Sequence, residues 1–492
     1  MVADRYRSFM RIVRILSIIL AVLGVVKGWE NLLFGAILIL WGHNMMFSLK
    51  NQEGRLPFLL FHITFFTFLL GRPLLTILHS DGLILYEVKR YQATAESVML
   101  ALELIFLSLI GLWMGAQLSL YLEKAEKQTY EASKMKDASK TKYGKQAALI
   151  VFIASYLCEV VVIIEKVMFI ISHSYVSYYV DFKSSLPYII YVGSTFMFFS
   201  LCIWLAFLPS KKEAYIVLGS YVILRLPMAI CGARTDFVLA ILFSMVYFFF
   251  RDYLERKHEW VGAWEKRFMI IGATVGIVLL GILNYIREQK TVVSFSPFVL
   301  FEDFFFKQGV TFSWLCAGLA KAEQLRNRGV VSYTFGPLID WLRHGTIARL
   351  LGADALTESN SIQNATESNI LAHHLSWILL GKKKYLQGHG TGSCYILELF
   401  LDFRFWGVFL VGILLGMCLF AFFRLAGKSV WICSFLFMTI NGFLYMPRAC
   451  ALKAIDFVWR LPFWFSYAGI FILGRILEKR SRRKGISDQH DF

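Results

Sequence analysis

The chain carries, at residues 146–172, the run QAALIVFIASYLCEVVVIIEKVMFIIS. A helix rises about 1.5 Å per residue and the hydrocarbon layer of a bilayer is about 30 Å thick, so a run of this length is long enough to span it. Charges at membrane depth are costly, and Glu159, Glu165 and Lys166 are therefore expected to pair with other helices. The run predicts one spanning helix within a larger bundle.

Apolar runs of similar length recur along the chain. They predict about twelve spans, near 11–28, 31–49, 56–78, 97–121, 146–172, 187–208, 213–231, 236–250, 268–286, 404–423, 429–447 and 460–477. The composition, 57% apolar and 17% charged, holds more apolar surface than a soluble core can bury. We expect an all-α polytopic membrane protein with one large, partly helical external loop.

The spans divide the chain into four expected parts. These are an N-terminal membrane bundle of about nine spans (1–286), a large external loop (287–393), about three C-terminal spans (394–477) and a basic cytoplasmic tail (478–492). Within the loop, helical spacing of apolar residues predicts helices over 312–325 and 335–351, and an interfacial segment over 370–380. The polar stretch 353–369 is expected to be a mobile excursion.

The formal charge of +17 lies mostly beside the spans rather than on one surface. Lys and Arg accumulate in short cytoplasmic loops, and their distribution places both termini in the cytoplasm and the large loop outside. We therefore expect the bilayer, and no nucleic acid, as the surface that these cations meet.

Cysteine and histidine spacing predicts neither a metal site nor a bound cofactor. The chain has eight cysteines without a CxxC pair, and no HExxH, GxSxG or P-loop motif. Cys231, Cys316, Cys394 and Cys450 lie in or beside segments expected outside, where the sequence leaves a disulfide open.

Two arginines stand beside prolines inside expected spans. Arg72-Pro73 and Arg225-Leu226-Pro227 each place a cation where proline frees backbone carbonyls, which is typical of broken helices that line a polar cavity. The alternative is structural pairing within the bundle.

Two short external segments carry cations that could meet an anion. Arg234 lies in the tight turn Cys231-Gly232-Ala233-Arg234-Thr235-Asp236, where Thr235 or Asp236 can cap the next helix. Arg448, Lys453 and Arg460 follow Tyr445 at the far end of the penultimate span, against the expected charge bias. An anionic ligand on the outer face explains both, and a solvated, capped turn is the alternative for the first.

A glycine-rich segment, Gly388-His389-Gly390-Thr391-Gly392-Ser393, precedes an apolar helix. Glycines let backbone approach a ligand closely, and they bring the imidazole of His389 to the start of that helix. Glu398 and Asp402 are four residues apart, hence on one helical face, where they can bind the cations above. The alternative is a flexible re-entry turn.

At these residues the chain resembles the Wzy family of O-antigen and capsule repeat-unit polymerases. The resemblance rests on Gly232 to Asp236, on Gly388 to Ser393 followed by Tyr395-Ile-Leu-Glu398, Asp402-Phe403 and Gly407-Val408, and on Tyr445-Met-Pro-Arg448. Arg404 stands where the family often has glycine, and the chain lacks the Arg-x10-Gly motif of some members.

The resemblance implies a GT-C-like membrane glycosyltransferase in the bacterial inner membrane. Its substrates would be undecaprenyl-diphosphate-linked oligosaccharides, joined by an inverting, metal-independent transfer at the external face, with a chain-length regulator and a flippase as partners. Arginines that stabilise the diphosphate leaving group suit this chemistry.

The roles of single residues follow from that chemistry. Arg234 and Arg448 are expected to stabilise the leaving group, and His389 is expected to act as general base, with Asp236 and Glu398 as rivals. The expected substrate-binding residues are Arg72, Arg225, Gly390, Gly392, Tyr445, Lys453 and Arg460.

Three other functions stay open at this point. An O-antigen ligase-like transferase shares the same chemistry, and a polysaccharide or lipid flippase suits a dozen spans with buried charges. A membrane O-acyltransferase would use His373-His374, but this pair lies in the polar external loop.

Overall fold

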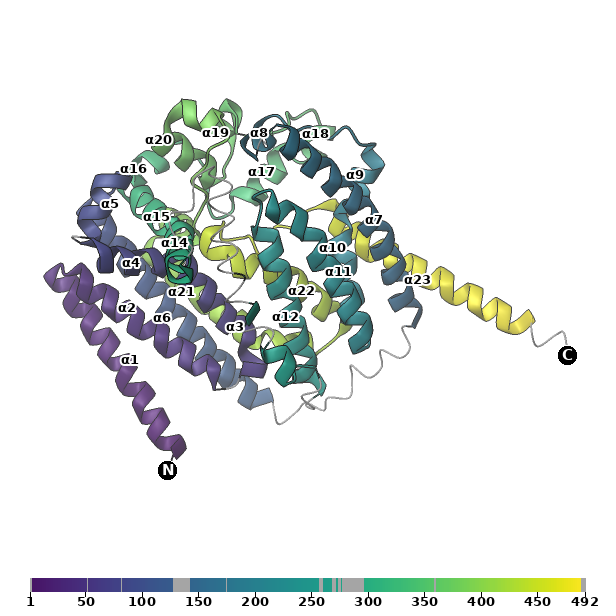
Figure 1. Ribbon diagram of the computed structural model, residues 1–492, viewed down its shortest axis with the longest axis horizontal. Coiled ribbons are helices and arrows are strands. Elements are labelled where there is room, and N and C mark those ends of the chain that lie inside the picture. The colour runs from purple at the N-terminus through teal and green to yellow at the C-terminus, as the bar shows by residue number, and fades with distance from the viewer. Residues whose placement is uncertain are drawn as a thin grey trace. The chain divides into compact units, whose positions relative to one another are not determined.

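The computed structural model describes residues 2–50, 52–80, 82–126, 142–173, 175–255, 260–267, 271–272, 276, 296–357 and 360–487. Over these residues the chain consists of helices joined by turns (Figure 1). It divides into two compact units, of which the first comprises Met1–Gln128, Val261–Phe422 and Phe443–Lys453, and the second the remainder. The predicted all-α class is confirmed.

The first unit contains two groups of helices and a 3-10 turn. The N-terminal group is α1 (Val2–Lys27), α2 (Glu30–Leu49), α3 (Gln52–Phe65), the π-helix η1 (Phe66–Leu70), α4 (Gly71–His79), α5 (Leu83–Tyr91) and α6 (Ala95–Glu126). The later elements are α14 (Pro297–Gln308), α15 (Val310–Ala320), α16 (Ala322–Arg326), α17 (Gly336–His344), α18 (Thr346–Leu350), α19 (Ile362–Glu367), α20 (Leu371–Leu386), α21 (Tyr395–Ala426) as far as Phe422, and η3 (Met446–Arg448).

The second unit combines long and short helices. It contains α7 (Lys142–Ser172), α8 (Tyr175–Val180), α9 (Tyr188–Thr195), α10 (Met197–Ala206), α11 (Lys211–Ile230), α12 (Thr235–Glu255), α22 (Val430–Tyr445) as far as Gly442, and α23 (Leu461–Ser487).

Eleven helices in the described part of the chain are long and apolar enough to cross a membrane. They agree with eleven of the predicted spans, while the predicted span over 268–286 falls almost wholly outside the described residues. Apolar side chains stay exposed along these helices, for example Ile12, Ile19 and Val26 of α1, as expected where lipid replaces water. The chain is a multi-pass membrane protein.

Small residues bring α6 and α21 together in the first unit. A Cβ added at Gly111 or Gly115 would clash with the backbone of α21, and one at Gly416 would clash with Leu112 of α6. Close backbone approach through glycine is a common way for membrane helices to pack.

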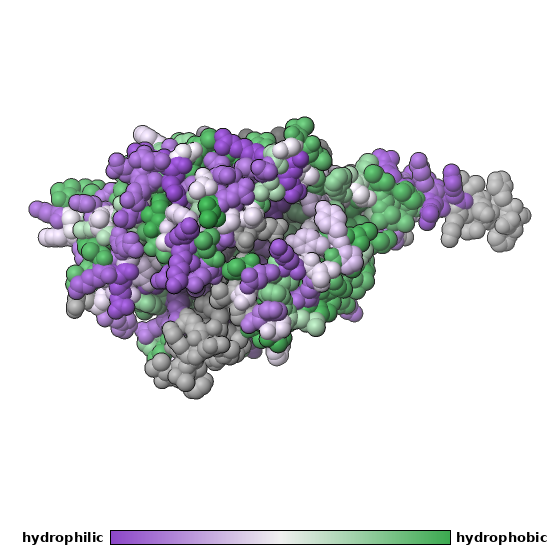
Figure 2. All heavy atoms as spheres, turned by 90° about the horizontal axis from the view of Figure 1, so that it is seen from above, coloured by the Kyte–Doolittle hydropathy of each residue, from purple (hydrophilic) through white to green (hydrophobic). Residues whose placement is uncertain are grey.

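The large loop is folded over its described part. The predicted helices appear as α15 with α16, α17 with α18, and α20. The prediction of a mobile excursion over 353–369 was wrong for its C-terminal part. The helix α19 forms there, and Asp340 accepts hydrogen bonds from Ser368 and Asn369. Viewed from the side of α19 and α20, hydrophilic residues gather over these helices (Figure 2).

Candidate active site

The C-terminal end of α14 is held by two arginines of the first unit. Arg72 Nη1 donates to the carbonyl of Phe306 (3.1 Å), and Arg448 Nη1 donates to the main-chain and side-chain oxygens of Gln308 (3.2 and 2.9 Å). The last carbonyls of a helix lack intrahelical partners and carry partial negative charge, which favours cations. Two of the predicted site arginines are thus brought to one helix end.

Arg72 is buried in an aromatic and polar surround. Its Nη2 donates to the hydroxyls of Tyr91 (2.6 Å) and Tyr86 (3.2 Å), and its guanidinium lies over the ring of Phe306. The π-helix η1 ends just before it, where Pro73 cannot donate a main-chain hydrogen bond. Gly309 leaves room for this arrangement, because a Cβ there would clash with Arg72.

A buried carboxyl lies near Arg72. Glu87 is fully buried, and its Oε1 accepts a hydrogen bond from the hydroxyl of Ser313 (2.9 Å). Burial raises the pKa of Glu87 to about 7, although Ser313 and the charge of Arg72 oppose this rise.

Phe68 of η1 joins this region to the Tyr445–Arg448 segment. Its ring packs edge-on against Tyr445 at 5.7 Å, and the guanidinium of Arg448 lies 5.7 Å from the same ring centroid. Tyr445 and Arg448 are thus held beside η1 by one aromatic side chain.

Glu398 connects the other two motifs of the first unit. Its Oε1 accepts a hydrogen bond from the hydroxyl of Ser393 (2.5 Å), and its Oε2 accepts one from the amide of Ala451 (2.8 Å). The side chain is fully buried. A single carboxyl therefore ties the end of the glycine-rich segment to the residues just after Arg448.

The glycine-rich segment presents His389 from a fixed backbone. The amide of His389 donates to Lys384 and its carbonyl accepts from Asn360, whereas its side chain is exposed. Gly388 and Gly392 have φ of 87° and 76°, which favours glycine. Gly390 lies between them, and next to it Thr391 is bound through its amide to the hydroxyl of Ser376.

Asp402 has a different partner set from the one we expected. Its carboxyl accepts hydrogen bonds from the hydroxyl of Ser332 and from the amides of Tyr333 and Thr334. Asp402 thus fixes the turn before α17, and neither it nor Glu398 makes an ion pair with an arginine among the described residues.

In the second unit, Arg225 pairs with an acid inside the helix bundle. Its Nη1 donates to Glu159 Oε1 at 2.6 Å, and both side chains are largely buried. Across the turn to α12, Arg234 is buried, Asp236 is exposed and Gly232 has a φ of 116°. The partner expected for Glu159 is confirmed, whereas Glu165, which was expected to pair with another helix, accepts hydrogen bonds from Ser184 and Ser185 in the segment before α9.

The remaining predicted cations differ in their surroundings. Arg460 is exposed and forms an ion pair with Asp456, while Lys453 is half-buried. Since Lys453 ends the first unit and Arg460 lies in the second, each is described with its own unit.

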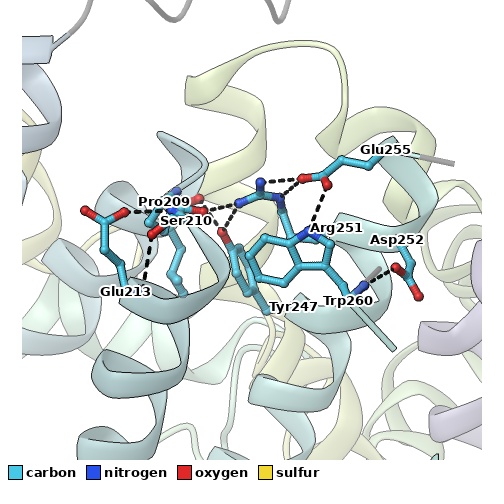
Figure 3. A network of polar contacts seen from close by, with 9 residues as sticks. Pro209, Ser210, Glu213, Tyr247, Arg251, Asp252, Glu255 and Trp260 are labelled. Carbon is cyan, nitrogen blue, oxygen red and sulfur yellow. Dashed lines mark hydrogen bonds and ion pairs between the residues drawn. The ribbon is translucent and has the colours of Figure 1, made fainter. Parts of the chain in front are cut away.

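A second arginine of the second unit is also neutralised locally (Figure 3). Arg251 pairs with Glu255 and donates to the carbonyl of Pro209, and Glu255 also accepts from the indole of Trp260. This network fastens the residues after α12 to the start of α11, where Ser210 and Glu213 form a capping box.

His373 and His374 of the loop form hydrogen bonds with other residues of the loop. His374 accepts from Arg328 at Nδ1 and, through Nε2, bonds to the carbonyl of Ser368, and His373 bonds to the hydroxyl of Tyr385. Burial lowers the pKa of His374 to about 4. Both imidazoles thus help to hold the folded loop together.

Sequence reasoning missed several residues that build the site. Tyr86, Tyr91 and Gln308 lie far from the motifs and carry no spacing that points to Arg72 or Arg448. No disulfide joins any of the cysteines within the described residues, so the pairing that the sequence left open is not formed there.

The comparisons with known proteins agree with the resemblance. The family model described as O-antigen polysaccharide polymerase Wzy matches residues 8–481, nearly the whole chain. No curated protein and no solved structure matches significantly. Because the family match extends through both units and includes all three motif segments, the chain belongs to the Wzy family of O-antigen polysaccharide polymerases.

Proposed function

We propose that this protein polymerises undecaprenyl-diphosphate-linked oligosaccharide repeat units at the external face of the bacterial inner membrane. Family membership supplies repeat-unit polymerisation, a polymerising glycosyltransferase activity and a lipid-linked oligosaccharide in a bilayer. The carrier, the face of the membrane and the residue roles are the proposal. The cytoplasmic position of both termini is part of it and follows from the charge distribution.

One observation carries the proposal. In the first unit, Glu398 joins the glycine-rich segment to the segment after Arg448, while Arg448 itself reaches the end of α14, which Arg72 also contacts. An imidazole on a fixed loop can act as a general base, and guanidinium groups at a helix end can stabilise a diphosphate leaving group, which supports glycosyl transfer.

The proposed reaction has two lipid-linked substrates. A sugar hydroxyl of the acceptor attacks the anomeric carbon of the donor chain, the bond from that carbon to the diphosphate oxygen breaks, and undecaprenyl diphosphate leaves. Arg448 and Arg234 are proposed to stabilise the charge that develops on the diphosphate. Arg72, Arg225, Tyr445, Lys453 and Arg460 are proposed to line the path of the substrate.

His389 is proposed to accept the proton of the attacking hydroxyl. Its side chain is exposed, whereas Glu398 is buried with both oxygens already accepting hydrogen bonds. Asp236 is exposed and stays a rival. Gly390 and Gly392 are proposed to let the acceptor approach the backbone beside His389. Inversion at the anomeric carbon and independence from metal remain part of the proposal.

Reconstitution tests the function directly. The purified full chain is placed in proteoliposomes with lipid-linked repeat units, and products are separated by length. A ladder of lengthening products supports polymerisation. A single transfer to a different lipid acceptor would instead indicate a ligase, and movement of the lipid without bond formation would indicate a flippase.

Two variants test the assigned residues. Arg234→Ala and Arg448→Ala are expected to abolish the ladder while leaving the amount of protein unchanged. Arg482→Ala is the matched control, because Arg482 is an exposed arginine paired with Glu478 near the C-terminus. A ladder of wild-type length from both site variants would refute the assignment.

A further inference from the structure

Two arginines of the first unit lie beside one phenylalanine, with partners that differ from those of Arg448 and Arg72. The guanidinium carbons of Arg326 and Arg404 lie 5.8 and 5.7 Å from the ring centroid of Phe400. Within the described residues neither arginine makes an ion pair with a carboxylate, and Arg326 Nη2 is buried without a hydrogen-bond partner. Arg326 Nε donates only to the carbonyl of Leu401.

This arrangement is electrostatically unfavourable on its own. Burial, and then the charge of Arg404, lowers the pKa of Arg326. Like charges repel, and a buried guanidinium nitrogen without a partner has lost its water without compensation. An anion bound by both groups would offset both costs.

Arg404 is also held in a strained conformation. Its φ of 58° and ψ of −148° interrupt α21, in a region of backbone space that glycine occupies readily and arginine rarely. The surrounding residues Phe403, Phe405 and Trp406 are exposed. A strained, exposed residue in an otherwise regular helix is a common feature of binding sites.

The length of α21 indicates where this cluster lies in the bilayer. The helix has 32 residues, and its part after Arg404, residues 405–426, is roughly 33 Å long, which matches the hydrocarbon layer. Arg404 then lies at the level of the headgroups, where exposed aromatic rings such as Trp406 are also favoured.

We infer that Arg326 and Arg404 form a second anion site, which binds the phosphate of a lipid headgroup. Two sources share this chemistry: the diphosphate of the acceptor substrate and an anionic phospholipid of the bilayer. The first source rests on the proposed function, because polymerisation needs two lipid diphosphates at once, one of them leaving at Arg448. The second source does not depend on it.

The test counts bound lipids on the full chain by native mass spectrometry. The probes are undecaprenyl diphosphate, undecaprenol, which lacks phosphate, and phosphatidylglycerol. The variants are Arg326→Ala and Arg404→Gly. The second removes the charge, and glycine suits the backbone conformation of residue 404. Arg448→Ala marks the other site, and Arg482→Ala is the control.

If the site holds the acceptor, the wild type binds two undecaprenyl diphosphates and each of Arg326→Ala, Arg404→Gly and Arg448→Ala binds one. If it holds a phospholipid, the first two variants lose phosphatidylglycerol at least tenfold and keep undecaprenyl diphosphate. Undecaprenol binding is unchanged in both cases. The inference would be overturned if Arg326→Ala and Arg404→Gly both bound undecaprenyl diphosphate and phosphatidylglycerol as the wild type does. Absence of a product ladder would refute only the proposed function.

Discussion

Three arginines of the second unit and three of the first have different kinds of partner. In the second unit, Arg225 pairs with Glu159, Arg251 with Glu255 and Arg460 with Asp456. In the first unit, Arg72, Arg448 and Arg326 donate to carbonyl, amide or phenolic oxygens and make no ion pair within its described residues.

This difference separates two uses of arginine in a membrane protein. A guanidinium matched by a carboxylate is neutral as a pair and holds helices together. A guanidinium held only by neutral oxygens keeps its charge available to an anion. The comparison therefore favours Arg448 as a ligand for diphosphate, whereas Arg225, which is proposed to line the substrate path, is already paired with Glu159 in the structure.

The largest effect is expected at the proposed base. His389→Ala should lower the rate of polymerisation by about 10²- to 10⁴-fold, the usual contribution of a general base. The measurement is the initial rate of ladder formation in proteoliposomes. His173→Ala, an exposed histidine of the second unit stacked on Phe169, is the control and should keep the wild-type rate. Equal rates for both variants would remove His389 from the mechanism.

The next effect concerns the carboxyl that joins two motifs. Glu398→Ala leaves the Ser393 hydroxyl and the Ala451 amide without their buried acceptor, so polymerisation should fall about 100-fold, mainly in kcat. Glu398→Gln keeps an acceptor oxygen and should recover part of the rate. The measurement is kcat of both variants, with circular dichroism to determine the folded fraction. If Glu398 only stabilises the fold and does not position the two motifs, kcat of the folded fraction will be unchanged.

Breaking the ion pair of the second unit measures its contribution to stability and tests the proposed contact of Arg225 with the substrate. Arg225→Ala leaves Glu159 as an unpaired buried charge and should cost about 4 kcal/mol of unfolding free energy. The double variant Arg225→Ala with Glu159→Ala should recover most of this loss. A double variant that folds and makes no polymer would show that Arg225 acts on the substrate, as the sequence predicts.

The smallest effect is a pH dependence in the first unit. The pKa of Glu87, about 7, lies above its ordinary value of 4.5, so the folded state binds more protons than the unfolded state between these pH values. Stability should therefore fall as pH rises from about 4.5 to 7, by about 3 kcal/mol in total. Thermal unfolding of Glu87→Gln should lack this slope, and an identical slope in the variant would assign it to other groups.

Most of the membrane-spanning helices could be predicted from the sequence, because the thickness of the bilayer sets the length that an apolar run needs to cross it. A helix was expected over Glu398 and Asp402, but the predicted span begins nine residues after the start of α21. Tyr395 packs inside the first unit, where its hydroxyl shares a hydrogen bond with the hydroxyl of Ser108. The π-helix η1 was not predicted either. Periodicity does not distinguish lipid from protein as the surround of an apolar helix.

The candidate site was predicted only in part, because partners distant in sequence decide what a charge does. Arg72 and Arg225 look alike beside their prolines, yet one meets Tyr91 and the other Glu159. Glu398 was expected to bind cations, and it accepts from Ser393 and Ala451 instead. Residue types and spacing identify such groups, whereas tertiary contacts assign their partners.

The most direct test of the account is the rate of bond formation by Arg448 variants with a lipid-linked repeat unit. Arg448→Ala is predicted to lose at least about 100-fold in kcat, since it removes a donor that stabilises the leaving diphosphate. Arg448→Lys is predicted to keep part of the rate, because it keeps the charge and loses the planar fork. A wild-type rate for Arg448→Ala would contradict the account.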